Sequence, residues 1–351
     1  LEQEFGWSRA QVSFGLTVFA FTAMLGGPLI GMAIDRLGTR RIAVFGLALS
    51  AIAFAAIGLA GANILIWYGL ILLFALISLS AKATIWSAGI SSVFTAGRSL
   101  ALAAMLSGTA LAQSLSPLIA DILIDRIGWR GAYAAMGIGW GGLAALLVAL
   151  FFVDARALSA RESNRPPSAV ELPGLTAPQA FKDRRIQRIA AANLLAALVG
   201  SGISVHLVPI LSETVAGKDM AVRLMTIGFV AGLAGKLLTG WALDRWRSAW
   251  VPFLSLALSA LAYLLLLDLL QSVTALGAAV FLWAFGAGAS LQATTYLVSR
   301  YAGLRAFGTV FGSISSLMMA GTALSPWLAG LLHDATGSYD LLLKVAIPAV
   351  L

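Results

Sequence analysis

The sequence predicts an all-α integral membrane protein, and its composition is the first reason. Of the 351 residues 60% are hydrophobic and only 11% are charged, and the mean hydropathy is +0.93. A soluble chain of this length could not bury so much apolar surface, so most of the chain is expected to lie in lipid.

The length of the apolar runs is the second reason. At about 1.5 Å per residue, about 20 residues span a hydrocarbon core of about 30 Å as a helix. A barrel strand would show strict alternation over about ten residues, which is not the pattern here. We therefore expect about ten complete membrane helices and part of an eleventh. The runs lie near 11–34, 42–61, 64–94, 99–124, 131–153, 188–211, 221–243, 249–269, 272–298 and 306–332, and the eleventh begins near 341.

An internal repeat is the third reason. The stretch Gly31-Met-Ala-Ile-Asp-Arg-Leu-Gly-Thr-Arg-Arg41 returns as Gly240-Trp-Ala-Leu-Asp-Arg-Trp-Arg247, 209 residues later (240 − 31). The stretch 115–128 returns at 324–337 with the same offset. Two separate matches at one offset indicate a duplicated half.

The repeat predicts the domain organisation. We expect an N-terminal helical bundle over 1–153, a cytoplasmic linker over 154–187 and a C-terminal bundle over 188–351. The counterparts of the runs 188–211 and 131–153 fall wholly or partly outside the chain. The expected parent therefore has twelve helices, of which this sequence lacks the first and much of the last. The end of the linker, 177–186, is expected to form a short interfacial helix.

The distribution of Lys and Arg predicts the orientation. The positive-inside rule places residue 1 outside and the basic loops in the cytoplasm, so we expect a multi-pass protein of the cell inner (plasma) membrane. The net charge is +8, but the basic residues are spread over short loops and do not gather on one face, so a nucleic-acid partner is not expected. The loops at 35–41, 95–99, 154–188, 244–248 and 299–305 hold fifteen Lys and Arg, and the alternate loops and ends hold six.

The stretch 31–41 carries a family resemblance. It meets the loop signature Gly-x-x-x-Asp-Arg-x-Gly-x-Arg-Arg of the major facilitator superfamily, which the chain resembles over essentially its whole length. The resemblance implies two pseudo-symmetric six-helix bundles and secondary transport by alternating access at a central site. The matching residues are Gly31, Asp35, Arg36, Gly38, Arg40 and Arg41, echoed by Gly240, Asp244 and Arg245.

Within the superfamily the chain is similar to the bacterial monocarboxylate-porter-like branch. The stretch from Phe5 to Arg9 resembles the start of that branch's second helix, and Arg98 to Thr109 resembles its fifth-helix signature. The chain departs from the branch in two ways. The branch's first helix is not in this sequence, and its eighth helix often carries an Arg where this chain has Lys236.

Asp35 and Asp244 are candidate gating residues. At the cytoplasmic boundary, Asp35 can cap a helix N-terminus or pair with an arginine such as Arg98. Gly31 lacks a side chain, so a neighbouring helix can approach closely. A contact made in one state and broken in the other is what a gate needs. The alternative is that the arginines of this stretch only anchor it on the cytoplasmic side.

Lys82 and Lys236 are the sharpest indication of a substrate. Each lies deep in an apolar run, where inserting a lysine costs about 2.5–3.5 kcal/mol. Their counterparts under the repeat are Leu291 and Gly27, so the duplicated fold requires neither lysine. No acidic residue lies equally deep, so we expect an anionic substrate, with a carboxylate as the natural candidate. The alternative is a structural lysine that bonds to helix carbonyls or is held neutral by burial.

Three further polar residues complete the candidate binding set. Gln113 and Gln292 occupy comparable places in the two halves and could bind polar substrate groups or bond helix to helix. His206 could take up a proton near neutral pH, which would couple transport to protons, or could be a hydrogen-bonding wall residue. Polar side chains at membrane depth face protein or water, so the helices that carry them are expected to line a cavity between the halves.

Enzyme chemistry is not indicated. With two histidines and no cysteine, the sequence supports neither a zinc site nor a cysteine nucleophile. We expect no cofactor and a monomer that carries a small organic anion. Two alternatives are a proton-coupled exporter of drugs and a non-transporting membrane receptor or scaffold.

Overall fold

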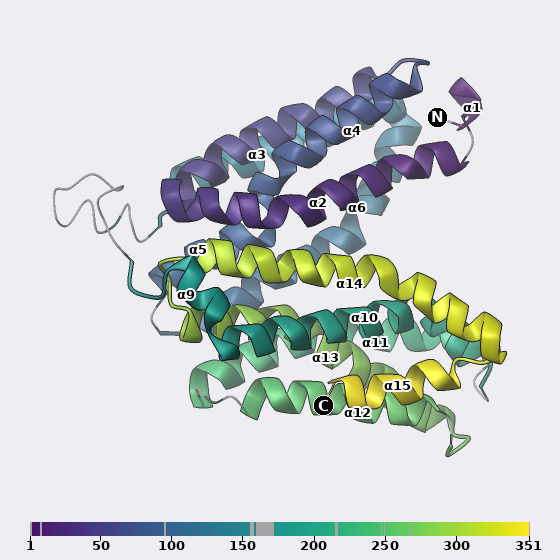
Figure 1. Cartoon of the computed structure of the whole chain (residues 1–351). Helices are drawn as coiled ribbons and strands as arrows, with labels where there is room; N and C mark the ends of the chain where they lie inside the picture. Colours follow the sequence, from purple (N-terminus) through teal and green to yellow (C-terminus); the bar gives the residue numbers. More distant parts are fainter. Residues whose placement is uncertain are drawn as a thin grey trace. The chain divides into compact units, whose positions relative to one another are not determined.

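The described residues fold mainly into helices (Figure 1). This computed structural model describes residues 2–7, 9–94, 96–154, 158, 172–214, 217–246, 248, 250–267 and 269–350. Within these residues no strand forms, and one isolated β-bridge joins Gly174 to Gly303. A helix satisfies its own backbone N–H and C=O groups, which is why runs that lie in lipid adopt it.

The helices follow the predicted runs. Eight described stretches are long and apolar enough to cross a membrane, so the predicted all-α membrane fold is confirmed. The first elements are α1 (Glu2–Phe5), α2 (Arg9–Leu37), α3 (Thr39–Ala56), η1 (Ile57–Leu59), α4 (Ile64–Ser78), η2 (Leu79–Ala81), α5 (Ala83–Val93), α6 (Arg98–Ala134), the π-helix η3 (Ala135–Gly141) and α7 (Gly142–Phe151). The later elements are α9 (Ala177–Lys182), α10 (Arg184–Ser212), α11 (Gly217–Trp246), α12 (Trp250–Leu266), α13 (Val273–Tyr301), α14 (Phe307–Thr336) and α15 (Asp340–Val350).

The predicted run 64–94 is not one helix. It breaks after α4 into the 3₁₀ turn η2, and Lys82 then adopts an extended conformation with φ −70° and ψ 162°. The hydroxyls of Ser78 and Ser80 donate to the carbonyls of Ala75 and Ile77. Such local bonds offer the backbone an alternative to continuing the helix, and they give a physical reason for the break.

Two other boundaries are set by single residues. Gly128 has φ 71°, a left-handed conformation that suits glycine, and it interrupts α6 between the predicted runs 99–124 and 131–153. The short helix predicted over 177–186 is divided, because Asp183 leaves α9 and caps α10. Its carboxylate accepts the N–H of Arg185 at 2.7 Å.

Contacts group the chain into two compact units. The start of α14 belongs to the first unit and the start of α6 to the second. The predicted boundaries follow the two halves of the sequence instead and stay a prediction. Residues 155–157 and 159–171 of the predicted linker lie outside the described residues. The first unit comprises Leu1–Val93, Leu111–Ala180 and Ala302–Ser316, and the second comprises Phe94–Ala110, Phe181–Tyr301 and Leu317–Leu351.

Each unit has its own apolar core. In the first unit Trp7 and Trp67 pack together with their ring centroids 6.1 Å apart. In the second unit Leu207, Leu211 and Leu276 are fully buried. These cores hold the helices that carry the candidate site residues.

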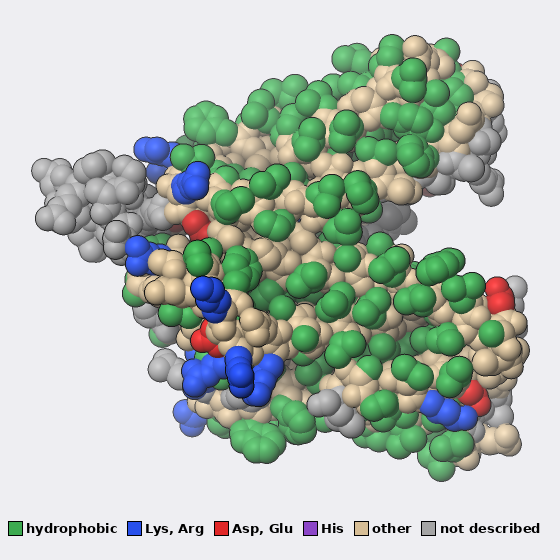
Figure 2. Space-filling model, viewed as in Figure 1, with side chains coloured by type: hydrophobic (Ala, Val, Ile, Leu, Met, Phe, Trp, Pro, Cys, Tyr) green, Lys and Arg blue, Asp and Glu red, His purple; other side chains and the backbone are tan. Residues whose placement is uncertain are grey.

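The outward surface of the helices is apolar. Figure 2 shows hydrophobic side chains along the helices, while most of the visible Lys and Arg side chains gather at the helix ends near α9. Phe45, Leu65 and Phe151 expose 69%, 72% and 74% of their surface. Apolar patches of this extent lie against lipid in a membrane protein, because in water they would drive association.

Candidate functional site

Asp35 lies near the end of α2 and caps the start of α14. Its Oδ1 accepts the N–H of Gly308 at 2.8 Å, and its Oδ2 accepts the N–H and the hydroxyl of Thr309 at 2.8 and 2.6 Å. The first N–H groups of a helix have no partner inside it, and the positive end of the helix dipole favours a carboxylate. The structure thus contains the helix cap suggested by the sequence, and the gating role of Asp35 stays a prediction.

Asp244 makes the same contact in the second unit. Near the end of α11, its Oδ1 accepts the N–H of Ser99 at 2.9 Å and its Oδ2 accepts the N–H of Leu100 at 2.8 Å. Adding 209 to positions 35, 99 and 100 gives 244, 308 and 309, so the two caps correspond residue by residue. The capped residues differ in side chain. The repeat therefore preserves a backbone contact rather than a sequence.

Glycines bring these helices together. A Cβ on Gly31 would lie 2.8 Å from the Cα of Thr309, and one on Gly27 would lie 2.6 Å from the carbonyl oxygen of Gly312. A Cβ on Gly240 would lie 2.7 Å from the Cβ of Ala103 on α6. Close backbone approach therefore holds each carboxylate within reach of the helix it caps.

Asp154 is a candidate that the sequence analysis missed. It follows α7 and is 6% exposed, and its Oδ2 accepts the hydroxyl of Thr39 and the N–H of Arg40, both at 3.0 Å. It thereby caps α3, which begins directly after Gly38, a residue with φ 85°. The Arg40 side chain donates to the carbonyl of Ala149 at 3.0 Å. The available signal was an acidic residue directly after the last apolar residue of a run.

The other basic residues of the motif have different surroundings. Arg98 begins α6, where its Nε donates to the carbonyl of Phe94 at 2.8 Å and its Nη1 to the hydroxyl of Ser299 at 3.4 Å. The remaining predicted residues have exposed side chains, as expected of positive-inside anchors. They are Arg36, Arg41 and Arg245.

Lys82 lies at the break between η2 and α5. Its Nζ donates to the carbonyl of Ala23 on α2 at 2.8 Å, and the ring N–H of Trp86 donates to the carbonyl of Ala81 at 2.9 Å. The counterpart under the repeat, Leu291, lies inside the uninterrupted helix α13. The break is therefore particular to the first half, and it places a cation on unwound backbone.

Lys236 and Gln292 form a polar cluster in the second unit. The Nζ of Lys236 donates to the carbonyl of Leu106 on α6 at 3.3 Å, and the Nε2 of Gln292 donates to the carbonyl of Lys236 at 2.5 Å. Gln292 is fully buried, and its Oε1 has no hydrogen-bond partner among the described residues. Gln292 therefore links α13 to α11 in this conformation. The side chain of Gln113 lies outside the described residues.

Both lysines donate to backbone carbonyls, which is one part of the structural alternative. Within the described part of the chain, neither pairs with a carboxylate. A carbonyl satisfies one N–H of an ammonium group but does not neutralise its charge, which is costly to keep out of water. An anion would be a better partner than the carbonyl, because it brings an opposite charge to the ammonium group as well as a hydrogen-bond acceptor.

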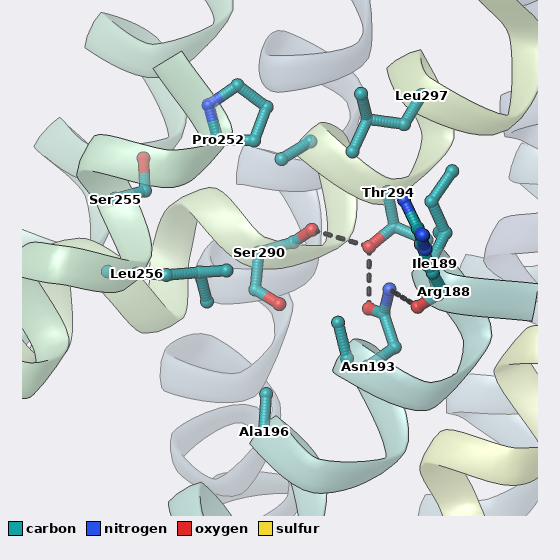
Figure 3. Close-up of a pocket in the computed structure, with 13 residues that line it drawn as sticks. Arg188, Ile189, Asn193, Ala196, Pro252, Ser255, Leu256, Ser290, Thr294 and Leu297 are labelled. Atoms are coloured by element: carbon teal, nitrogen blue, oxygen red, sulfur yellow. Dashed lines mark hydrogen bonds between the residues drawn. The ribbon is translucent and has the colours of Figure 1, made fainter. Parts of the chain in front are cut away.

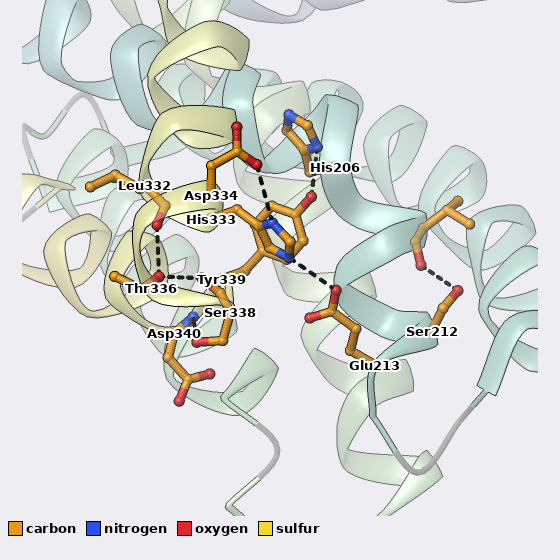
Figure 4. A network of polar contacts seen from close by, with 11 residues as sticks. His206, Ser212, Glu213, Leu332, His333, Asp334, Thr336, Ser338, Tyr339 and Asp340 are labelled. Carbon is orange, nitrogen blue, oxygen red and sulfur yellow. Dashed lines mark hydrogen bonds and ion pairs between the residues drawn. The ribbon is translucent and has the colours of Figure 1, made fainter.

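Both histidines of the chain meet Tyr339 at one end of the second unit (Figure 4). The Tyr339 hydroxyl lies 3.0 Å from Nδ1 of His206, whose Nε2 lies 3.3 Å from the carbonyl oxygen of Pro326. These contacts fit a neutral imidazole that donates from Nε2 and accepts at Nδ1. The His333 ring packs against the Tyr339 ring in a tilted arrangement with the centroids 4.4 Å apart, and its Nε2 lies 3.4 Å from Oε1 of Glu213. Removal from water and nearby carboxylates raise the pKa of Tyr339, so the hydroxyl stays protonated.

A separate pocket lies among α10, α12 and α13 of the second unit (Figure 3). Its volume is about 230 Å³. The Thr294 hydroxyl donates to Oδ1 of Asn193 at 2.6 Å, and Asn193 donates to the carbonyl of Ile189 at 2.8 Å. These polar groups thus satisfy one another, and none of the candidate binding residues lines the pocket. We therefore do not assign the substrate to it.

The described residues thus form an all-α membrane fold with matching caps in its two sequence halves. The family described as Major Facilitator Superfamily matches residues 1–326, and the chain belongs to this family. Its members are transporters and not enzymes. Secondary transport across a membrane is accordingly the function of the class.

Two curated relatives align with almost the whole chain. Monocarboxylate transporter 11 of Homo sapiens is 26% identical over 350 residues, which cover 94% of this chain and 70% of that protein. The MFS transporter asaE of Aspergillus flavus is 23% identical over 333 residues, which cover 92% of this chain and 71% of that protein. Identities this low leave the substrate undetermined.

Solved structures of the same fold are also similar. The human organic anion transporter MFSD10 (TETRAN) has a TM-score of 0.72 and 17% identity over 100% of this chain and 87% of that one. A bacterial homologue of the iron transporter ferroportin has a TM-score of 0.73 and 15% identity, over 99% of this chain and 90% of that one. At these identities the similarity shows the fold alone.

Proposed function

We propose that the protein carries a small organic anion, of the monocarboxylate type, across the plasma membrane by alternating access. The observation that carries this proposal is that Lys82 and Lys236 have only backbone carbonyls as described partners. An ionised lysine at membrane depth is costly, and such residues usually mark a substrate or ion path. A substrate carboxylate would supply the missing negative charge.

Two relatives support the substrate class by their names. One is a monocarboxylate transporter and another is an organic anion transporter. The first has the higher identity to this chain, 26%, and it agrees with the branch that the sequence resembles. The names support the choice of a carboxylate panel for the first assays.

The contacts of α11 suggest how binding could act on the gate. Lys236 and Asp244 both lie on α11, and both bond to α6: Lys236 to the carbonyl of Leu106, Asp244 to the N–H groups that begin the helix. A substrate carboxylate that takes the Lys236 ammonium would release the carbonyl of Leu106, which keeps the hydroxyl of Thr109 at 2.6 Å. Binding would then leave the Asp244 cap as the main polar link between these helices. This difference between bound and free states is what a ligand needs to shift a conformational equilibrium.

We propose proton coupling through His206 as a separate element of the function. Its neutral form is satisfied by Tyr339 and Pro326, so uptake of a proton would have to rearrange the Tyr339 hydroxyl. A His206→Gln variant that loses the dependence of uptake on a pH gradient, but keeps exchange at equal pH, would support this role. Unchanged dependence on the gradient would reject it.

Counterflow in proteoliposomes tests the substrate class. The full-length protein is loaded with unlabelled compound, and uptake of labelled carboxylates is compared with that of neutral and cationic compounds of similar size. Uptake of carboxylates alone supports the proposal. Uptake of lipophilic cations favours the drug exporter, and no uptake of any class by a folded protein favours the receptor or scaffold. We also propose a monomer, which light scattering of the purified protein checks.

A further inference from the structure

Residues 173–175 of the linker form main-chain hydrogen bonds with residues 302–305 of the loop before α14. The carbonyl of Pro173 accepts the N–H of Leu304 at 2.8 Å and that of Arg305 at 3.2 Å. In return Leu175 donates its N–H to the carbonyl of Ala302 at 2.8 Å. Both segments belong to the first compact unit. The linker therefore makes a specific contact here and does not merely connect the two halves.

Glycine lies opposite glycine at the centre of this contact. Gly174 and Gly303 form an antiparallel bridge, with φ 140° and 75°. A Cβ on Gly303 would lie 2.5 Å from the Cα of Gly174, and a Cβ on Gly174 would lie 2.6 Å from the carbonyl oxygen of Ala302. Neither position accepts a side chain without movement of the backbone. We refer to residues 173–175 together with 302–305 as the clip.

The clip and Asp35 hold the same stretch of chain. The clip ends shortly before Phe307, the first residue of α14, and Asp35 binds the N–H groups of Gly308 and Thr309. Two separate elements, the linker and α2, therefore hold the start of this helix. One uses main-chain hydrogen bonds and the other uses a side-chain carboxylate.

The corresponding start of α6 has no described main-chain contact like the clip. Asp244 caps it as Asp35 caps α14. The described residues of the loop before α6 have one main-chain hydrogen bond of this kind, and it is local. The N–H of Ala101 donates to the carbonyl of Gly97. The two halves thus match in the caps and differ in the clip, so release of the two helices should not be equally easy.

We propose that the clip is a lock by which the linker controls how readily α14 leaves Asp35. The proposal rests on the gating role proposed for Asp35 and not on the identity of the substrate. Opening of the α2–α14 contact then requires rupture of three main-chain hydrogen bonds in addition to the cap. A change that weakens the clip increases the time that this contact spends open.

Cysteine labelling tests the lock directly, because the chain contains no cysteine of its own. A single Ile34→Cys reporter is placed on α2, where Ile34 is 4% exposed. Its reaction with an impermeant maleimide is followed in inside-out vesicles that hold the full-length protein. Gly303→Ala is compared with Gly97→Ala, because Gly97 also has a positive φ, 66°, but a Cβ there meets nothing within 4 Å.

The lock predicts that Gly303→Ala raises the labelling rate about tenfold, while Gly97→Ala leaves it unchanged. Gly174→Ala weakens the clip from the exposed linker and must give the same increase, which guards against misfolding of a single variant. Equal rates in all three variants and the parent overturn the lock. The variant Asp35→Asn separates the gating role of Asp35 from the lock. If Asp35→Asn raises the labelling rate and Gly303→Ala does not, the lock is rejected and the gate is kept. If neither variant changes the labelling rate, both are rejected.

Discussion

Asp35 and Asp244 use one chemical device at two places in the sequence. Each carboxylate offers two oxygens to two successive N–H groups at the start of a helix. For Asp35 the motif left two alternatives, a helix cap or a pair with an arginine such as Arg98, and the structure contains the cap. The capped residues were not predictable, since nothing local to Asp35 identifies Gly308 as its partner and nothing local to Asp244 identifies Ser99. Only the folded chain brings them together.

Replacement of Asp35 by Asn is expected to destabilise the protein more than replacement of Asp244. An amide has one oxygen, so its NH₂ would face a backbone N–H and leave that donor unsatisfied, at a cost of about 1–3 kcal/mol. Asp35 also accepts the Thr309 hydroxyl and therefore loses more. Thermal unfolding of the purified variants measures the difference. Asp125→Asn, at an exposed position, is the control, and an Asp35→Asn midpoint equal to the control would refute the cap.

Glycine spacing and serine content shape the elements that carry these residues. Gly27 and Gly31 on α2 face Gly312 and Gly308 on α14, and the absence of a side chain at Gly31 predicts such a close approach in outline. The break at Lys82 was not predicted, because hydropathy is continuous over 64–94. The signal was present in Ser78 and Ser80, but a serine in a membrane helix usually bonds to its own helix without breaking it.

Gly31→Ala tests the crossing of α2 with α14. The added methyl group would lie 2.8 Å from the Cα of Thr309, so the helices must separate, at a cost of about 1–3 kcal/mol. Unfolding by titration with sodium dodecyl sulfate measures the loss. Gly108→Ala in α6 is the matched control, because a Cβ there meets nothing within 4 Å. Equal stability of the two variants would show that the helices do not touch at Gly31.

Hydrogen exchange tests the break at Lys82. Backbone amides of residues 79–83 are expected to exchange faster than those of 288–292, their counterparts in the continuous helix α13. The physical reason is that the N–H of Lys82 reaches the carbonyl of Leu79 at only 3.5 Å. Mass spectrometry of the protein in nanodiscs resolves the two peptides. Equal protection would mean that the helix is continuous.

The fold of the whole molecule was more predictable from the sequence than its local contacts were. Composition, run length and the 209-residue repeat each depend on many residues, so they survive local irregularities and indicate the membrane fold, which the structure and the family confirm. The distribution of contacts was less predictable. The starts of α6 and α14 group with helices of the opposite sequence half, and only long-range packing determines this exchange.

The orientation follows from the basic loops and can be checked with single cysteines. Gly61→Cys, in the exposed loop after η1, is expected to react with an impermeant maleimide on intact cells. Pro178→Cys, in the exposed part of α9, is expected to react only after the cells are permeabilised. The reverse pattern would place the linker outside and invert the predicted topology.

The charge of the half-buried Lys82 and Lys236 is the basis of the proposed substrate class, and one measurement tests it most directly. Exchange of a labelled monocarboxylate is compared between the full-length parent and the double variant Lys82→Gln, Lys236→Gln, with the exposed Lys344→Gln as control. If each lysine contributes a charge-assisted hydrogen bond to the anion, the double variant loses exchange about a hundredfold while the control keeps it. Exchange within about twofold of the parent, in a double variant that folds normally, would show that the lysines do not bind the substrate.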